Sequence, residues 1–196
     1  MIVNRKLLLL ILLLSGCAST HKIAVHSDQD VLKDNNNSVS YKSGVTPLTQ
    51  PSTAYLAYSN DGYDDYHSYP NSGEIVMDLL HHIFSPYFSK FGVAKEYHSA
   101  QVDYIMARKA GFYYFILPRL TKWTQSNTLF TGVPNRVAMT LKIYNLKTNR
   151  LIDKVEIKGT GSKIAVFEKT PPELLKKPLD SVVDALFDAD ATDQNQ

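Results

Sequence analysis

The only thiol in this sequence, Cys17, is the residue best placed for covalent chemistry. It follows an unbroken apolar run of eight residues, Leu7–Leu14, and the small residues Ser15 and Gly16, and a short positively charged start precedes the run. This order is typical of a secretory signal peptide, because the run is far shorter than the roughly 20 apolar residues that span a bilayer as a helix. Since the chain has no second cysteine, no disulfide forms within it, and the thiol is left for another reaction.

The segment Leu14-Ser15-Gly16-Cys17 resembles the lipobox of bacterial lipoproteins. In that family the thiol takes a diacylglycerol as a thioether, the chain is cut before the cysteine, and the new amine is acylated, for example with palmitate. The resemblance implies a signal peptide at residues 1–16, cleavage between Gly16 and Cys17, and lipidation of Cys17. The alternative is an ordinary secretory signal in which the cysteine is incidental.

The residue after the cysteine predicts where such a lipoprotein is sorted. In the lipoprotein family an aspartate there tends to retain the protein at the inner membrane. Here the residue is Ala18, so the resemblance implies the outer membrane, with the protein facing the periplasm. Each buried methylene contributes about 0.8 kcal/mol, so several acyl chains on Cys17 are the expected link to the membrane.

The mature chain, residues 17–196, carries no excess charge. Without Arg5 and Lys6 of the leader, 19 basic residues stand against 19 acidic ones. A nucleic-acid-binding domain normally has a basic footprint, so this balance argues against nucleic acid as a partner.

The stretch NDGYDDYHSYP, residues 60–70, gathers carboxylates and tyrosines in one glycine-containing loop. Carboxylates in such a loop suit calcium, but the spacing lacks the later glutamate of the twelve-residue calcium loop, and aspartates also favour solvated turns. Tyrosines offer contact area at low entropy cost, so a protein or glycan contact is the other interpretation. The candidate partner-binding residues are Tyr63, Tyr66, Tyr69, Asp64 and Asp65.

Other candidates for metal binding are His81 and His82. As neighbours on a helix they point about 100° apart, whereas helical metal ligands are three or four residues apart. Asp78 and His82 have that spacing, which equally suits a surface hydrogen bond. The sequence therefore predicts no metal and no cofactor.

Nucleophilic catalysis has little support. Cys17 is expected to be blocked by lipid, and GTGSK has the spacing of neither a phosphate-binding loop nor a serine elbow. A catalytic triad of serine, histidine and aspartate from distant positions in the sequence is left open as an alternative. Arg119, Lys122 and Trp123 could together form a contact patch. The alternative is that Trp123 is half-buried and closes an edge of the sheet. We predict no catalytic residue and a protein that is not an enzyme.

Polarity divides the mature chain into three parts. Residues 17–52 are mostly polar and predict a lipidated cysteine on a flexible tether, with a short strand at Ile23–Val25 as an alternative. Residues 188–196 predict a disordered tail. Residues 53–187 have the size of one globular domain.

The globular part predicts an α+β domain, a mixed sheet packed against helices in the order β-α-β-α-β-β-β-α. Apolar runs and period-two alternation indicate strands, and apolar residues three and four apart indicate helices. The strands are expected at 53–58, 91–97, 112–117, 136–144 and 151–159, with a shorter one at 162–167. The first helix is expected to be capped by Asn71 or Ser72 and to run to about Pro86, the second to be capped by Ser99 and to run through Lys109, and the third to cover about 173–187.

Specific side chains follow from this pattern. Val102, Ile105 and Met106 should face inward on the second helix. Pro118 should end the central strand, and Pro178 should interrupt the last helix.

Two resemblances rest on these elements. The order of elements, ARKAGFYYFILPRLTKW at residues 107–123 and the hairpin NLKTNR resemble the periplasmic domain shared by the amino-terminal part of the Tol translocation protein and the curli-secretion lipoprotein. Across about residues 54–187 the chain also resembles an uncharacterised family of small proteobacterial lipoproteins of unknown function. The matching motifs are AYLAY, the same long segment, IYNLKTNRLIDKVEIKG and PPELL. These motifs are structural, so they imply a fold more than an activity.

The predicted function is a binding or accessory role in envelope assembly or integrity. The partner is an envelope protein or the protein's own copies, met through the tyrosine loop or an exposed sheet edge. One alternative is an envelope hydrolase acting on glycan or peptide, which needs convergent ionisable residues in a pocket. Another is a subunit of a secretion-type ring, which needs a self-complementary surface.

Overall fold

The computed structural model describes residues 29–33, 37–41, 46–49, 52–126, 133–162 and 169–187. The signal peptide, Cys17, the alternative strand at 23–25 and the tail from 188 lie outside these ranges, as does most of the short strand expected at 162–167. Within them, no helix combines the length and the apolar character that crossing a bilayer requires.

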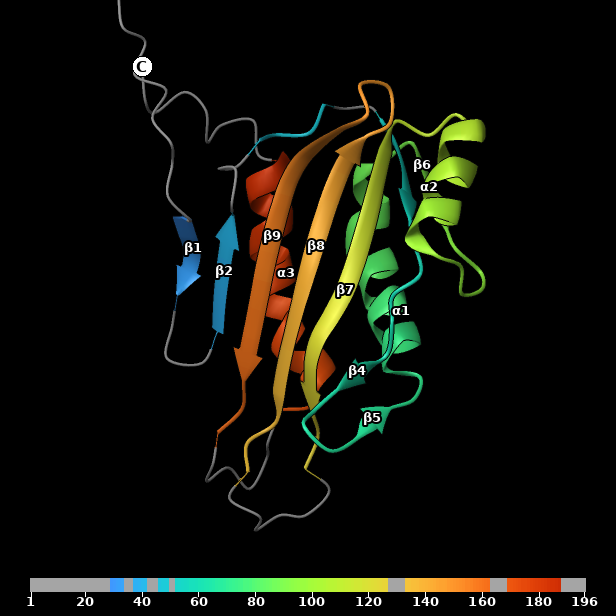
Figure 1. The fold of residues 1–196 in the computed structure, drawn as a ribbon. Helices are drawn as coiled ribbons and strands as arrows, with labels where there is room; N and C mark the ends of the chain where they lie inside the picture. Colours follow the sequence, from blue (N-terminus) through green and yellow to red (C-terminus); the bar gives the residue numbers. More distant parts are fainter. Residues whose placement is uncertain are drawn as a thin grey trace, which may run out of the picture.

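One mixed sheet forms the centre of the molecule, in the order β1-β2-β9-β8-β7-β3-β6 (Figure 1). β3 is parallel to both β6 and β7, and the other pairs are antiparallel. The strands are β1 (Gln29–Lys33), β2 (Asn37–Tyr41), β3 (Thr53–Leu56), β6 (Lys90–Val93), β7 (Tyr114–Thr124), β8 (Arg136–Asn145) and β9 (Arg150–Thr160). The predicted α+β class is confirmed.

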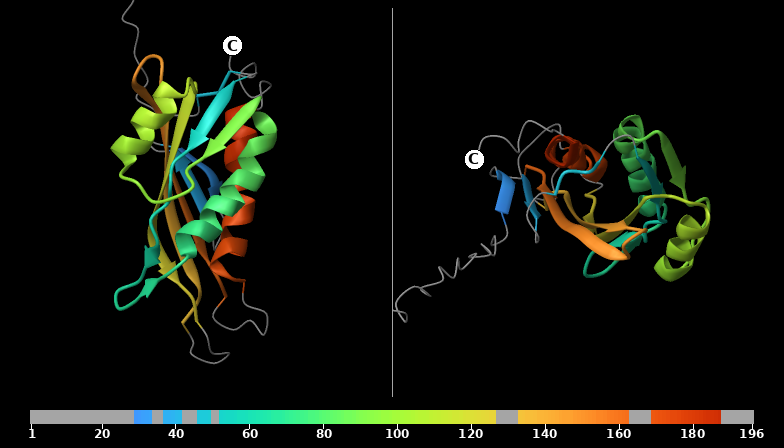
Figure 2. Two further views of the ribbon diagram at one scale, coloured as in Figure 1. Left: turned by 90° about the vertical axis from the view of Figure 1, so that its right-hand side faces the viewer. Right: turned by 90° about the horizontal axis from the view of Figure 1, so that it is seen from above.

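Helices cover the two faces of the sheet unequally. α1 (Ser72–Phe84), with the short 3₁₀ helix η1 (Ser85–Tyr87), and α3 (Pro171–Phe187) lie against one face and share the main hydrophobic core (Figure 2). α2 (Ala100–Lys109) lies at the other side, where Ala107 packs in a second cluster with Phe115 and Leu117.

Alternation in β8 decides which face of the sheet is buried. The apolar residues Val137, Met139, Leu141 and Ile143 are all buried, whereas the residues between them are partly exposed. The hairpin to β9 turns through Asn149, whose φ is 58°, a value that asparagine tolerates better than most residues. The prediction for these two strands is confirmed.

The sheet begins earlier in the chain than expected. β1 and β2 lie inside the segment predicted to be a tether, and β2 pairs with β9 over its whole length. β2 needs little apolar sequence, because β1 and β9 pair with its main chain on both sides and the buried Val39 side chain belongs to the main core. Leu48 is also buried, and its N–H donates to the Leu186 carbonyl at 2.8 Å. The tether prediction is wrong for residues 29–33, 37–41 and 46–49.

Pro118 does not end β7, which continues to Thr124. Two residues on, the main-chain N–H and C=O of Leu120 bond to the Asn60 side chain, at 3.1 and 2.9 Å, and not to β8. N–H directions alternate along a strand, so the main chain of residue 118 points to the same side as that of Leu120, away from β8. Because proline lacks a donor only on that side, the hydrogen bonds between β7 and β8 stay intact.

Pro178 does not interrupt α3 either. An interior proline costs roughly 3 kcal/mol, whereas each fully buried leucine or valine contributes roughly 1.5–3 kcal/mol. The helix buries several such side chains, and at its start Glu173 Oε2 accepts hydrogen bonds from both the main-chain N–H and the hydroxyl of Thr170, each at 2.8 Å. The buried residues are Leu174, Leu175, Leu179, Val182, Val183 and Leu186.

Candidate functional site

The tyrosine and aspartate residues lie on a small hairpin between β3 and α1. Its strands are β4 (Gly62–Tyr63) and β5 (Ser68–Tyr69), with Gly62 opposite Tyr69 and Tyr63 opposite Ser68. We call residues 61–70 the β4–β5 hairpin. It lies beside the carboxyl-terminal end of β7 (Figure 1).

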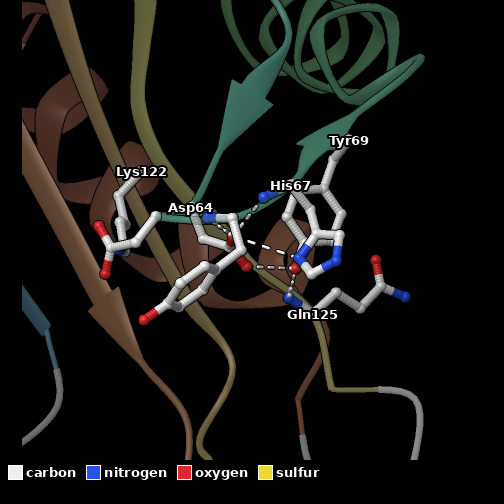
Figure 3. A network of polar contacts seen from close by, with 7 residues as sticks. Asp64, His67, Tyr69, Lys122 and Gln125 are labelled. Carbon is white, nitrogen blue, oxygen red and sulfur yellow. Dashed lines mark hydrogen bonds and ion pairs between the residues drawn. The ribbon is translucent and has the colours of Figure 1, made fainter.

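Asp64 shapes the turn of the hairpin (Figure 3). Its Oδ1 accepts hydrogen bonds from the main-chain N–H groups of Tyr66 and His67, both at 2.8 Å, and its Oδ2 accepts one from the Tyr69 hydroxyl at 2.7 Å. These donors, the Tyr69 hydroxyl above all, lower the pKa of Asp64 from 3.8 to about 2. Asp64 is thus a fixed carboxylate at neutral pH.

The base of the hairpin is joined to the first turn of α1. Asp61 Oδ1 accepts from the Gly73 N–H at 2.9 Å, and Ser72 Oγ accepts from the Gly62 N–H at 2.8 Å. Neither residue proposed as the cap of this helix caps it: Asn71 occupies the position at φ 67° without a side-chain bond, and Ser72 is already within the helix. Asp61 lies eleven residues before the first residue of α1, so local spacing does not reveal it as a partner of this helix.

Trp123 lies under the hairpin. Only 2% of its surface is exposed, so the contact-patch interpretation is wrong, and the residue is more deeply buried than a half-buried edge residue. A Cβ on Gly62 would lie 2.4 Å from the Trp123 Cβ, so the backbone of β4 approaches the indole as closely as glycine allows.

Two contacts join the hairpin to β7 and the residue after it (Figure 3). The Lys122 ammonium lies 3.3 Å from Asp65 Oδ1, and the Gln125 N–H donates to the Tyr69 hydroxyl at 3.4 Å. Burial, followed by the hydrogen bond to Asp64, raises the pKa of Tyr69. The hairpin is therefore held at its turn, its base and its flank.

The five predicted partner-binding residues divide into two groups. Tyr63 is 53% exposed and Tyr66 88% exposed, and the Asp65 side chain is also largely in solvent. Asp64 and Tyr69 bond to each other and support the turn from inside. The structure thus leaves Tyr63, Tyr66 and Asp65 exposed to a partner.

The hairpin carboxylates do not converge on a calcium site. Asp61 binds the start of α1, Asp64 binds three donors of its own turn, and Asp65 faces Lys122. His81 and His82 are exposed on α1, and in the described ranges no three His, Cys, Asp or Glu side chains are grouped to hold a metal.

A second polar cluster, missed in the sequence, lies at the start of α2. Asp103 is fully buried; its Oδ2 accepts from the Tyr58 main-chain N–H at 3.2 Å, and its Oδ1 lies 3.4 Å from His98 Nδ1. His98 Nε2 lies 3.5 Å from Glu96 Oε1. Asp103 thus contacts both the Tyr58 main chain and His98, and these contacts tie the start of α2 to the segments before it.

The orientation of α2 contradicts the prediction. Val102, Ile105 and Met106 are 42%, 44% and 45% exposed, and Asp103 and Ala107 are the buried residues. The physical reason is that Ala107 allows close packing on the second cluster while Asp103 satisfies the Tyr58 N–H. The expected cap is confirmed, since Ser99 Oγ accepts from the Val102 N–H at 3.4 Å.

A family model for a domain of unknown function, DUF4823, matches residues 47–186. No curated protein matches the sequence. The expected membership of a family of unknown function agrees with this match, whereas the likeness to the Tol and curli domains stays a prediction.

Several solved structures align with this chain to differing extents. PelC from Paraburkholderia phytofirmans, a dodecamer, has a TM-score of 0.56 at 12% identity and covers 76% of this chain and 97% of its own. Lipoprotein GNA1162 from Neisseria meningitidis has a TM-score of 0.40 at 9% identity, covering 56% and 84%. The LpoB C-terminal domain from Salmonella enterica has a TM-score of 0.38 at 12% identity, covering 58% and 84%.

Proposed function

Because the chain belongs to the DUF4823 family, whose function is unknown, we propose its role from its residues. The protein is a lipoprotein of the bacterial envelope, anchored in the outer membrane through lipid on Cys17 and facing the periplasm. It is not an enzyme but an accessory protein that binds an envelope protein through the β4–β5 hairpin.

The observation that carries this proposal is the pair of exposed tyrosines on a rigid support. Tyr63 and Tyr66 present aromatic surface from a turn that Asp64 already fixes with three hydrogen bonds. A preorganised loop loses little conformational freedom on binding, and tyrosine adds large contact area with few rotatable bonds.

Electrostatics supports binding over hydrolysis at this hairpin. A general acid or base works best with a pKa near the operating pH, and Asp64, at about 2, is far below neutral. Its oxygens are also occupied by donors of the hairpin itself. The envelope hydrolase therefore finds no support here.

Assembly from several copies is the second candidate. The fold that this chain shares with PelC occurs there as a dodecamer, and a fold of this kind is thus compatible with a closed ring. Sedimentation of the lipidated protein in detergent separates the two: a single protomer mass contradicts the ring, and a defined oligomer supports it.

Mass spectrometry tests the anchor. Acylation predicts that the mature chain starts at Cys17 with a lipid mass on that residue, and that Cys17→Ser moves the protein out of the membrane fraction. An intact leader or a free thiol at Cys17 contradicts the proposal.

Crosslinked envelopes test the hairpin. The double variant Tyr63→Ala, Tyr66→Ala should recover fewer crosslinked partners than the wild type. Tyr97→Ala is the matched control, because Tyr97 is also a well-exposed tyrosine, 66%, outside the hairpin. Equal recovery from all three proteins contradicts the hairpin assignment.

A further inference from the structure

α2 presents an apolar and purely cationic surface to solvent. Val102, Ile105 and Met106 lie on its exposed side, and Arg108 and Lys109 are exposed in its last turn. The one carboxylate of the helix, Asp103, is fully buried. The outer side of α2 therefore carries no negative charge.

Specific contacts fix this orientation. Turning α2 to bury Ile105 would remove Asp103 from the Tyr58 N–H and from His98, which is 3.4 Å away. It would also withdraw Ala107 from the cluster that contains Phe115 and Leu117. Since these contacts hold the helix, the exposed apolar side chains are a stable feature of the surface, and clustered ones mark an interaction site.

Tyr104 and the outer residues of α2 line a shallow, open hollow. Its volume is about 410 Å³, and its lining residues are Tyr104, Ile105, Arg108 and Lys109. Two cations beside an aliphatic side chain fit a phosphate group that is attached to an apolar chain.

The neighbouring face of the sheet is also basic. Leu117, which packs in the cluster under α2, pairs with Lys142, and Lys142 pairs with Lys154, so all three side chains share the α2 side of the sheet. Two lysines directly opposite each other, such as Lys142 and Lys154, repel unless an anion lies nearby. For Lys154 that anion is the Glu156 carboxylate, whose Oε1 lies 2.6 Å from the Lys154 ammonium. Two rows away, Lys158 is exposed on the same face.

We propose that α2 is an interfacial helix that lies on an anionic phospholipid surface. Val102, Ile105 and Met106 enter the boundary between head groups and acyl chains, and Arg108 and Lys109 bind the phosphates. This inference rests on the proposed lipid anchor at Cys17, which keeps a bilayer within reach.

Chain length supports a lipid surface as the occupant. Eleven residues lie between Cys17 and Gln29, the first residue of β1, and the twelve steps from one to the other span at most about 40 Å. The sheet, with strands about 4.8 Å apart, is about 29 Å wide from β1 to β6. The segment is long enough for α2, at the far side of the sheet, to lie on the bilayer, and it keeps β1 within about 40 Å of the membrane surface.

Site-specific labelling tests the contact. In the lipidated protein Cys17 is a thioether, so Ile105→Cys introduces the only free thiol, and an environment-sensitive dye on it reports insertion. Asp180→Cys on α3, exposed on the opposite side of the sheet, is the matched control. Thermal unfolding of both labelled proteins checks that they are folded.

In vesicles of phosphatidylethanolamine and phosphatidylglycerol, we expect a blue shift at position 105 and quenching by brominated lipid several-fold stronger than at position 180. Arg108→Glu with Lys109→Glu should remove most of the difference. Equal responses at the two positions overturn the proposal. A response at 105 that needs no vesicles and grows with protein concentration also overturns it, because it indicates a second copy of the chain.

A further arm separates this inference from the anchor. The mature chain with Cys17→Ser cannot be acylated, and the same two labels on it should still respond differently to phosphatidylglycerol vesicles at low salt. If mass spectrometry finds no lipid on Cys17 and this difference persists, the anchor fails and α2 still binds lipid. Absence of the difference in this arm overturns the α2 contact alone.

Discussion

The Tyr69 hydroxyl donates a 2.7 Å hydrogen bond to Asp64 Oδ2 from within the same hairpin. This bond joins the turn, which Asp64 organises, to the last residue of β5, and the Gln125 N–H reaches the same hydroxyl. Two of the five residues expected to contact a partner, Asp64 and Tyr69, thus support the exposed residues of the hairpin.

Tyr69→Phe tests this support. The variant removes the largest cause of the low pKa of Asp64, so the pKa should rise from about 2 toward 3.8. A carboxyl titration followed by NMR measures it. Tyr63→Phe is the control, because Tyr63 lies on the exposed side of the hairpin and should leave the Asp64 titration unchanged. An unaltered pKa in Tyr69→Phe shows that the hydroxyl does not stabilise the carboxylate.

Asp64 also predicts how stability varies with pH. Its folded-state pKa, about 2, is below the ordinary 3.8, so its contribution is complete above about pH 4 and declines as the pH falls toward 2. Thermal unfolding midpoints between pH 2 and 5 should therefore fall less steeply in Asp64→Asn than in the wild type. Asp65→Asn, next to it in the turn and exposed, should follow the wild-type curve; equal slopes for all three proteins contradict the assignment.

Gly62→Ala should destabilise the junction of the hairpin with β7. The new Cβ would meet the Trp123 Cβ at 2.4 Å, and the buried indole cannot move without disturbing the core, so we expect a loss of roughly 1–3 kcal/mol in the free energy of unfolding. Urea unfolding measures this loss. Ser68→Ala, an exposed change in the same hairpin, should remain within about 0.5 kcal/mol of the wild type.

The sequence predicts the parts of this fold that a repeating pattern determines. In β8 the alternation of Val137, Met139, Leu141 and Ile143 assigns one face to the core, because a strand has only two faces. β2 lacks such a pattern, since its partner β9 supplies the main-chain hydrogen bonds and one buried valine suffices. A strand held mainly by its main-chain pairing is found only when its partner is known.

The same pattern misleads in α2. Val102, Ile105 and Met106 have helical spacing, yet two residues that look unremarkable in sequence set the rotation of the helix. Asp103 bonds to an N–H 45 positions earlier, and Ala107 permits close approach. The polar loop predicts that Tyr63 and Tyr66 are exposed. The inward position of Tyr69 involves packing on the main core and a contact with the Gln125 N–H, 56 positions away, which the loop sequence does not reveal.

Asp103→Ala should loosen α2 from the domain. The change leaves the Tyr58 N–H without its acceptor and His98 without the carboxylate at 3.4 Å, and an unsatisfied buried group costs about 1–3 kcal/mol. Asp103→Asn keeps an acceptor for the Tyr58 N–H and should recover part of this loss. Urea unfolding gives the free energy, and hydrogen exchange of residues 100–109 should accelerate in Asp103→Ala more than in α3. Asp78→Ala, an exposed change on α1, is the control. If Asp103→Ala and Asp78→Ala unfold alike, the buried carboxylate does not fix α2, and the exposed apolar side of that helix needs another cause.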